Sequence, residues 1–321
     1  MKKVAVTGAA GFIGSNLSKA LQDKGYELLL VDNFSRGKQK NLDYLGIKTE
    51  CKNLDLRHPY GDVFDGVDTV FHCACRIGGE QFLHGSNYNE LQALQDNLAI
   101  DRNVFRDCLR NKVKNIIFTS SVSIFNTSRQ YKEAKAVFNE RSIWDDPFEP
   151  EGGYGLAKYI AEEQLWLMRH MGINTSSVRI FKAYGPCDDY SEESGQVVLS
   201  LIRKALNYPK ENYVVWGDGS KKRCLLYIDD LVDAMMKIHE RGVYYDFNIG
   251  NDESTSIKTL AKKIAHLCGK DIHITYDLTK TGGPLSRVPD ITKAKQFLDW
   301  KPKTSLDVGL GKTWKWMEEI L

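Results

Sequence analysis

A tyrosine and a lysine stand four positions apart, at Tyr154 and Lys158. Residues at this spacing on a helix lie on one face, so the phenol and the ammonium would be neighbours. A phenol has a pKa of about 10, and that pKa must fall by roughly 3 pH units before it can act as a base at neutral pH. One nearby cation lowers it by only about 1 to 3 pH units. We therefore expect Lys158 to supply part of this lowering and a second positive charge to supply the rest.

Two serines, Ser120 and Ser121, end an apolar run at 115–119 that is typical of a buried strand. Hydroxyls at the carboxyl edge of a parallel sheet lie where ligands bind in open α/β folds. Ser121 could hold a substrate hydroxyl beside Tyr154, and with Lys158 these groups suit proton removal from an alcohol. Taken alone, the tyrosine and lysine fit a surface helix pair better than a catalytic pair, and one serine could simply end the strand.

Three glycines near the start of the chain favour the catalytic interpretation. Gly8, Gly11 and Gly14 lie between the apolar strand at 4–6 and a helix whose apolar stripe begins at Phe12 and Ile13. In such a corner the first glycine permits the tight turn, the second lets the backbone approach a pyrophosphate, and the third lets the helix pack on the strand. The helix N-terminus then faces the phosphates. The pattern predicts a dinucleotide cofactor.

The next apolar strand, at 27–31, ends in Asp32 and Asn33. An acidic residue about 20 positions beyond the glycines can accept hydrogen bonds from the adenosine ribose and repels the 2′-phosphate of NADP. The sequence therefore favours NAD, whose positive nicotinamide ring would complete the lowering of the tyrosine pKa. An aspartate that merely begins a turn is the alternative, and Arg36 and Lys38 leave NADP open.

Composition narrows the class of protein. The chain has 321 residues, with 44 Lys and Arg against 42 Asp and Glu, so no charge excess points to nucleic acid or to a membrane surface. Its seven cysteines form no Cys-x-x-Cys pair, no metal-ligand spacing is present, and no apolar run reaches the length of about 18 residues that a membrane span needs. The first strand follows Met1 almost at once and leaves no room for a signal peptide. We expect reduced thiols in a cytoplasmic protein without a metal.

Strand and helix patterns alternate along most of the chain, which predicts an α/β fold: a Rossmann-like doubly wound parallel sheet with a smaller α+β C-terminal substrate lobe. Further strands are expected at 47–51, 69–74 and 175–181, and helices at 87–111, 154–171, 197–206 and 257–268. Residues 224–228, 231–240 and 247–250 are expected to return to the main sheet. We assign residues 1–178 and 224–250 to the NAD-binding domain and residues 179–223 and 251–321 to the lobe.

These motifs, in this order, resemble the extended short-chain dehydrogenase/reductase family, specifically its NAD-dependent nucleotide-sugar epimerases and dehydratases. Matching segments cover nearly the whole chain: 7–14, 31–33, 53–56, 72–74, Asn97, 120–121, 154–158, 179–186, 216–219, Arg223, 227–230, 248–250, Arg287 and 298–302. The resemblance implies a tightly held NAD, a C-terminal lobe that binds a nucleoside-diphosphate sugar, and a homodimer.

The resemblance also implies roles for individual residues. Ser121, Tyr154 and Lys158 would be catalytic. The cofactor would contact Gly8, Gly11, Phe12, Ile13, Gly14, Asp32, Asn33, Asp55, Leu56, Ala74, Asn97, Tyr154 and Lys158. The substrate would contact Gly78, Gly79, Ser123, Lys182, Arg223 and Arg287. The two arginines would face the diphosphate, which guanidinium groups bind in a bidentate manner, although structural ion pairs are the alternative for both.

The residues after Ser121 narrow the choice of reaction. Dehydratases of this group resemble Thr-Asp-Glu here, related decarboxylases carry a glutamate, and GDP-mannose 3,5-epimerases carry a cysteine, whereas this chain has Val122 and Ser123. A C4 epimerase, which needs only the serine, tyrosine, lysine and NAD, is the best remaining match.

Two departures from the C4 epimerase pattern leave other readings open. The loop at 76–80 is more similar to that of the 3,5-epimerases, and Lys182 replaces an expected asparagine. Asp188 and Asp189 are loop residues that could reach the sugar, although we expect both at the surface. A 3,5-epimerase-like enzyme, a C4 dehydrogenase or reductase, and a catalytically silent nucleotide-binding protein remain alternatives.

Overall fold

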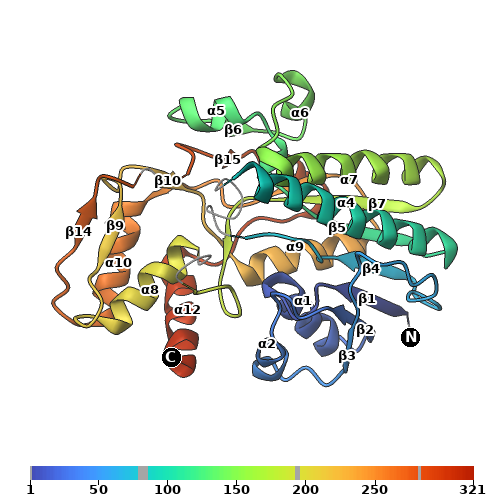
Figure 1. The fold of residues 1–321 in the computed structure, drawn as a ribbon, viewed down its shortest axis with the longest axis horizontal. Helices are drawn as coiled ribbons and strands as arrows, with labels where there is room; N and C mark the ends of the chain where they lie inside the picture. The colour runs from blue at the N-terminus through green and yellow to red at the C-terminus, as the bar shows by residue number, and fades with distance from the viewer. Residues whose placement is uncertain (1, 79–85, 192–195, 281–282) are drawn as a thin grey trace.

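The computed structural model describes residues 2–78, 86–191, 196–280 and 283–321 (Figure 1). Its strands are β1 (Lys3–Thr7), β2 (Glu27–Asp32), β3 (Cys51–Asn53), β4 (Thr69–His72), β5 (Asn115–Ser121), β6 (Val137–Phe138), β7 (Asn174–Ile180), β8 (Ala183–Tyr184), β9 (Val214–Trp216), β10 (Lys222–Arg223), β11 (Leu226–Tyr227), β12 (Phe247–Ile249), β13 (Thr255–Ser256), β14 (Thr275–Asp277) and β15 (Val288–Pro289). Its helices are α1 (Phe12–Asp23), α2 (Gln39–Tyr44), α4 (Asn87–Arg110), α5 (Thr127–Lys132), α6 (Ser142–Asp145), α7 (Gly152–His170), α8 (Val197–Asn207), α9 (Ile228–Arg241), α10 (Ile257–Cys268), α11 (Thr292–Leu298) and α12 (Leu306–Ile320), with a 3-10 turn at Val122–Ile124.

Seven strands form one parallel sheet in the order β12-β7-β5-β4-β1-β2-β3. The central strand β1 pairs with both neighbours, Val4 lying opposite Leu28 of β2 and Thr69 of β4. The order runs outward from β1 in both directions, as in a doubly wound sheet. The predicted fold class is confirmed.

Both faces of this sheet are buried, which explains why its central strands are apolar along their whole length. Helices α4 and α7 lie side by side over one face, and α1 and α9 cover the other (Figure 1). The core on the α4 side includes Val104 and Phe105, and the core on the α1 side includes Leu17 and Met235.

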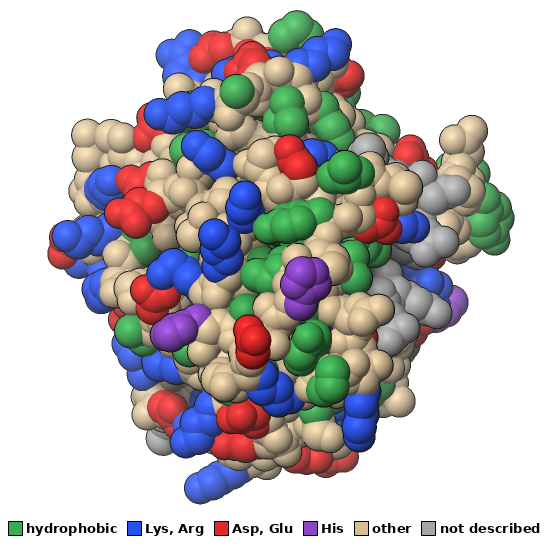
Figure 2. Space-filling view, turned by 90° about the vertical axis from the view of Figure 1, so that its left-hand side faces the viewer, with side chains coloured by type: hydrophobic (Ala, Val, Ile, Leu, Met, Phe, Trp, Pro, Cys, Tyr) green, Lys and Arg blue, Asp and Glu red, His purple; other side chains and the backbone are tan. Residues whose placement is uncertain are grey.

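The C-terminal lobe is built from α8, α10 and α12 together with two small sheets, β9–β14 and β10–β13. Apolar residues of α8 and α10 join the same core as the α1 side of the main sheet, so lobe and sheet share one hydrophobic interior. Figure 2 looks onto this lobe, where positively and negatively charged side chains are interspersed over the visible face.

Two predicted strands were wrong. The strand expected at 47–51 is the edge strand β3, which begins at Cys51 because the pairing with β2 sets Cys51 opposite Leu30. Residues 224–228 do not return to the main sheet, because Leu226 and Tyr227 of β11 pair with β8 outside it. Strand β7 continues to Ile180, past the domain boundary expected at 178. The division into 1–178 with 224–250 and 179–223 with 251–321 stays a prediction.

All seven cysteines are free thiols. Within the described ranges, no cluster of three or more histidine, cysteine or acidic side chains is arranged to hold a metal ion. None of the helices in the described part of the chain combines the length and the apolar character that a bilayer crossing requires.

Candidate active site

A pocket of about 1800 Å³ runs along the carboxyl edge of the sheet and between the sheet and the C-terminal lobe. It brings together most of the predicted site residues: Gly8, Gly11, Phe12, Ile13, Gly14, Asp32, Asn33, Asp55, Leu56, Ala74, Gly78, Ser121, Ser123, Tyr154, Lys182, Arg223 and Arg287. Lys158 and Asn97 are buried behind its wall, each with a relative exposure of 1%. Gly79 lies outside the described residues.

The backbone of the glycine corner between β1 and α1 packs closely only because its glycines lack side chains. Gly8 has φ +66°, and a Cβ there would lie 2.7 Å from the backbone nitrogen of Ala74. A Cβ on Gly14 would lie 2.1 Å from the carbonyl oxygen of Gly8, so α1 can pack this close to the turn only with glycine at that position. The first turn of α1 then faces the pocket, and a helix N-terminus favours phosphate. This corner fits the diphosphate of NAD.

Asp32 at the end of β2 accepts hydrogen bonds from nearby backbone amides and also lines the pocket. Its Oδ1 accepts a hydrogen bond from the Phe34 amide at 2.8 Å, and its Oδ2 accepts from the Ala10 amide at 3.0 Å. Burial raises the pKa of this carboxyl, and these amides oppose the rise. A carboxylate has further lone pairs for a ribose hydroxyl, so the turn contacts leave the predicted contact with NAD possible.

Three other predicted cofactor residues have partners within the protein. Hydrogen bonds from Arg57 lower the pKa of Asp55 to about 2, so this carboxyl is ionised where it lines the pocket. Asn97 accepts from the Arg76 amide at 2.7 Å and donates to the Arg76 carbonyl at 2.8 Å, so it fixes the backbone after β4. The Ala74 amide donates to Thr7 Oγ1. The predicted contacts of these residues with the cofactor stay predictions.

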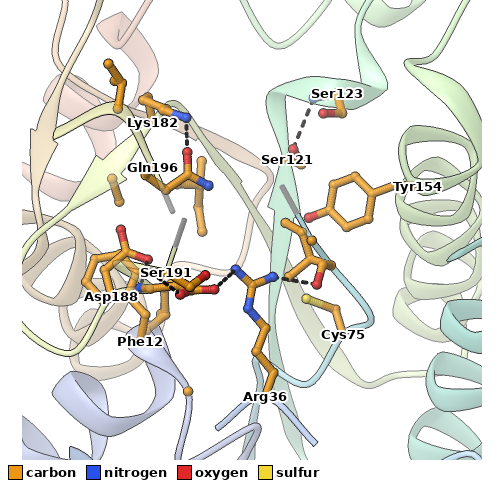
Figure 3. Close-up of a pocket in the computed structure, with 18 of the residues that line it drawn as sticks. Phe12, Arg36, Cys75, Ser121, Ser123, Tyr154, Lys182, Asp188, Ser191 and Gln196 are labelled. Atoms are coloured by element: carbon orange, nitrogen blue, oxygen red, sulfur yellow. Dashed lines mark hydrogen bonds and ion pairs between the residues drawn. The ribbon is translucent and has the colours of Figure 1, made fainter. Parts of the chain in front are cut away.

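Ser121 ends β5 and Tyr154 begins α7, and the two side chains meet in the pocket (Figure 3). Ser121 lies close enough to the Tyr154 phenol to lower its pKa, and the Ser123 amide donates to Ser121 Oγ at 3.1 Å. Lys158 lies one turn further along α7, with Nζ 5.8 Å from the centre of the Tyr154 ring. It donates to the Thr119 carbonyl at 2.8 Å, which fixes the ammonium below the pocket floor.

The pKa of Tyr154 moves opposite to the expected direction in the cofactor-free protein. Burial raises it well above the ordinary value of 10.0, the nearby Cys75 thiol adds to the rise, and Ser121 opposes it. The Lys158 ammonium is hydrogen-bonded to the Thr119 carbonyl and lies 5.8 Å from the centre of the Tyr154 ring. The phenol is therefore protonated until a positive charge arrives in the pocket.

A buried glutamate that the sequence analysis missed organises the wall beside Ser121. Glu151 accepts from Ser123 Oγ at 2.8 Å, from the Tyr131 hydroxyl at 3.2 Å and from Arg287 Nη2 at 2.5 Å. Arg287, expected near a diphosphate, thus also takes part in a structural ion pair. The sequence signal for Glu151 was its place three residues before Tyr154, at the start of the same helix.

The opposite wall comes from the segment after β7. Lys182 has φ +46°, and its buried ammonium donates to Gln196 Oε1. Burial, with Arg223 and Arg287 nearby, lowers the pKa of Lys182 to about 8. Asp188 was expected at the surface and is instead buried, with a relative exposure of 8%. Burial raises its pKa to about 7.

In the sequence, Arg36 was one of the residues that left NADP open as the cofactor. In the structure its side chain binds two other segments of the pocket wall. Its guanidinium donates to the Ile77 carbonyl and to Asp189 Oδ2, the latter at 3.2 Å, and so links the loop after β4 to the loop after β8 (Figure 3). Asp189, like Asp188, therefore lies on the pocket wall.

Comparison with known proteins places this fold and pocket in a family. Residues 4–250 match the NAD dependent epimerase/dehydratase family. The chain is similar to UDP-glucuronic acid decarboxylase 1 of Xenopus tropicalis, with 30% identity over 97% of this chain and 71% of that protein. It is also similar to GDP-mannose 3,5-epimerase 1 of Oryza sativa subsp. japonica, with 28% identity over 99% of this chain and 82% of that protein.

Among solved structures, the UDP-glucose 4-epimerase of Thermotoga maritima, determined with UDP-glucose, superposes with a TM-score of 0.86 at 28% identity and covers 99% of both chains. The family match, the parallel sheet and the glycine corner thus indicate the same family. The chain belongs to the NAD-dependent epimerase/dehydratase family and is an enzyme of the extended short-chain dehydrogenase/reductase type with NAD as its cofactor.

Proposed function

We propose that this enzyme interconverts nucleoside-diphosphate sugars that differ in configuration at C4, by oxidation to a 4-keto sugar and reduction from the other face. The observation that carries the proposal is the meeting of Ser121 and Tyr154 in a pocket of about 1800 Å³ that also includes the glycine corner and the segment of Lys182. The similarity to the Thermotoga maritima UDP-glucose 4-epimerase over 99% of both chains supports it.

In this mechanism Tyr154 takes the proton from the C4 hydroxyl and later returns it. NAD supplies a hydride acceptor and donor, and its oxidised ring supplies the positive charge that lowers the tyrosine pKa. Ser121 holds the same hydroxyl through a hydrogen bond and orients it toward the phenol. Lys158, anchored on the Thr119 carbonyl, keeps a fixed positive charge beneath the site and would be the residue that holds the cofactor ribose.

We also propose how the substrate lies along the pocket. Trp216 and Leu278 form an exposed apolar end, with relative exposures of 55% and 70%, and an aromatic face suits a nucleobase. Arg223 and Arg287 line the stretch between that end and the catalytic residues, where a diphosphate needs cations. The sugar then lies between Tyr154 and the wall that carries Lys182.

A 3,5-epimerase is the second candidate, because the pocket holds titratable groups that C4 inversion does not require. The Lys182 ammonium, with a pKa near 8, and the Glu151 carboxylate lie on opposite walls and could exchange protons at carbons beside a 4-keto group. The similarity to a GDP-mannose 3,5-epimerase over 99% of this chain supports this reading.

Incubation of the NAD-loaded enzyme with UDP-, GDP- and dTDP-sugars in deuterium oxide, followed by NMR, separates the two candidates. We expect a C4-inverted sugar without deuterium in the ring. Deuterium at C3 or C5 would establish the second candidate instead, and net accumulation of reduced cofactor would show a dehydrogenase.

We further propose that the enzyme is a cytoplasmic homodimer that associates through α4 and α7. These helices form one outer surface of the molecule (Figure 1), and they expose Tyr88, Leu91, Trp166 and Leu167. The seven free thiols support a reducing compartment. Light scattering should give twice the monomer mass for the native protein and the monomer mass for Trp166→Glu, and a monomeric native protein would contradict the proposal.

A further inference from the structure

One carboxylate oxygen in the pocket has no hydrogen-bond partner among the residues that the structure describes. Asp188 follows β8 and is buried, with a relative exposure of 8%. Its Oδ1 accepts from the Asp189 amide at 2.8 Å, but its Oδ2 has no hydrogen-bond partner among the described residues. A buried acceptor that stays unpaired costs free energy, so a ligand that donates a hydrogen to this oxygen would be favoured.

The charges that face Asp188 come from three segments and none of them satisfies Oδ2. Lys182, between β7 and β8, lowers the pKa of Asp188 through its charge but donates its hydrogen bond to Gln196. Arg36, after β2, acts in the same sense but is bound to Ile77 and Asp189. Asp189 itself opposes ionisation. The two cations favour the ionised form of the carboxyl, but neither donates a hydrogen bond to Oδ2.

Figure 3 places Asp188 on the wall with Gln196 and Lys182, across the pocket from Ser121 and Tyr154. Under the proposed function the sugar lies between these two walls. We propose that Asp188 Oδ2 accepts a hydrogen bond from a sugar hydroxyl and that its negative charge makes the enzyme select nucleotide sugars with neutral hexoses over those whose sugar carries a carboxylate. This inference rests on the proposed nucleotide-sugar function.

The discrimination follows from hydrogen-bond chemistry. A hydroxyl can donate to Oδ2, whereas an ionised carboxylate offers only acceptors and brings a like charge. Hydrogen bonds to a charged acceptor are roughly twice as strong as neutral ones. Sites built to bind a hydroxyl reject analogues that lack it, because their own polar groups are left unpaired. Asparagine keeps the shape of the side chain but removes the charge.

The experiment measures calorimetric dissociation constants of matched pairs, UDP-glucose with UDP-glucuronic acid and the corresponding dTDP and GDP pairs, on the NAD-loaded enzyme. For the native enzyme we expect the neutral sugar of the pair that binds to be held at least about tenfold more tightly, a difference of about 1.4 kcal/mol. In Asp188→Asn this preference should shrink about tenfold. Asp307→Asn, at an exposed carboxyl of α12, is the control and should keep the native preference.

The outcomes separate the two proposals. A preference that Asp188→Asn leaves unchanged overturns the role of Asp188 alone. Weaker NAD binding in Asp188→Asn with an unchanged sugar preference would also overturn it, because the donor to Oδ2 would then be the carboxamide of the cofactor. Failure of the native enzyme to bind any of these nucleotide sugars would contradict the proposed function and this inference with it.

Discussion

Replacement of Asp188 by asparagine should stabilise the cofactor-free protein, and the gain should grow as the pH rises. Burial raises the pKa of the Asp188 carboxyl from its ordinary value of 3.8 to about 7. The folded protein therefore holds this proton more tightly than the unfolded chain, so the native free energy of unfolding falls as the pH rises from 3.8 to about 7. At about 1.4 kcal/mol per pH unit, the full loss above pH 7 is about 4 kcal/mol.

Urea unfolding of both proteins between about pH 5 and pH 8 measures this difference directly, because every other titrating group is shared and cancels. The stability difference between Asp188→Asn and the native protein should increase by about 3 kcal/mol over this range. The control Asp307→Asn changes a carboxyl that is 69% exposed, and it should show almost no pH-dependent difference. A difference for Asp188→Asn that is flat to within about 0.5 kcal/mol would refute the reasoning, since the carboxyl would then titrate as it does in water.

Three further predictions test the site and its support. Tyr154→Phe should lower kcat about 10²- to 10⁴-fold while NAD still binds, which stopped-flow and fluorescence titration measure; native-like turnover would remove Tyr154 from the mechanism. Gly14→Ala places a Cβ 2.1 Å from the Gly8 oxygen, so NAD affinity should fall sharply, and an unchanged affinity would contradict the role of the corner. Glu162→Gln should lower the free energy of unfolding by about 3 to 5 kcal/mol because it leaves the buried Arg179 without its counter-charge, whereas a loss below about 1 kcal/mol would contradict this.

The glycine corner and the central strands could be predicted because their causes are local. The residues at 4–6 are all fully buried, and an apolar run before Gly8 predicts that burial from the sequence alone. The edge strand β3 could not be located in this way, because Lys52 and Asn53 are exposed and carry no hydrophobic pattern. Its position follows from pairing with β2, a contact between distant segments.

The same limit applies to the site. The spacing of Tyr154 and Lys158 predicts that they share a helix, which α7 confirms. It does not predict that the ammonium binds a carbonyl of β5, nor that burial of the phenol outweighs its charge. Glu151 was missed because its partner Ser123 lies 28 residues away in the sequence. Asp188 was assigned to the surface because its burial depends on the folded arrangement of the pocket wall, which includes the distant Arg36.

In the proposed reaction one hydrogen leaves C4 of the sugar and returns to the same carbon from the other face. The most direct measurement follows a nucleotide sugar that carries deuterium at C4 through turnover in ordinary water, with NMR of the product. We expect a C4-inverted product that keeps its deuterium at C4 and has unchanged configuration at C3 and C5. Loss of the label on inversion, or inversion at C3 or C5 with C4 unchanged, would contradict it.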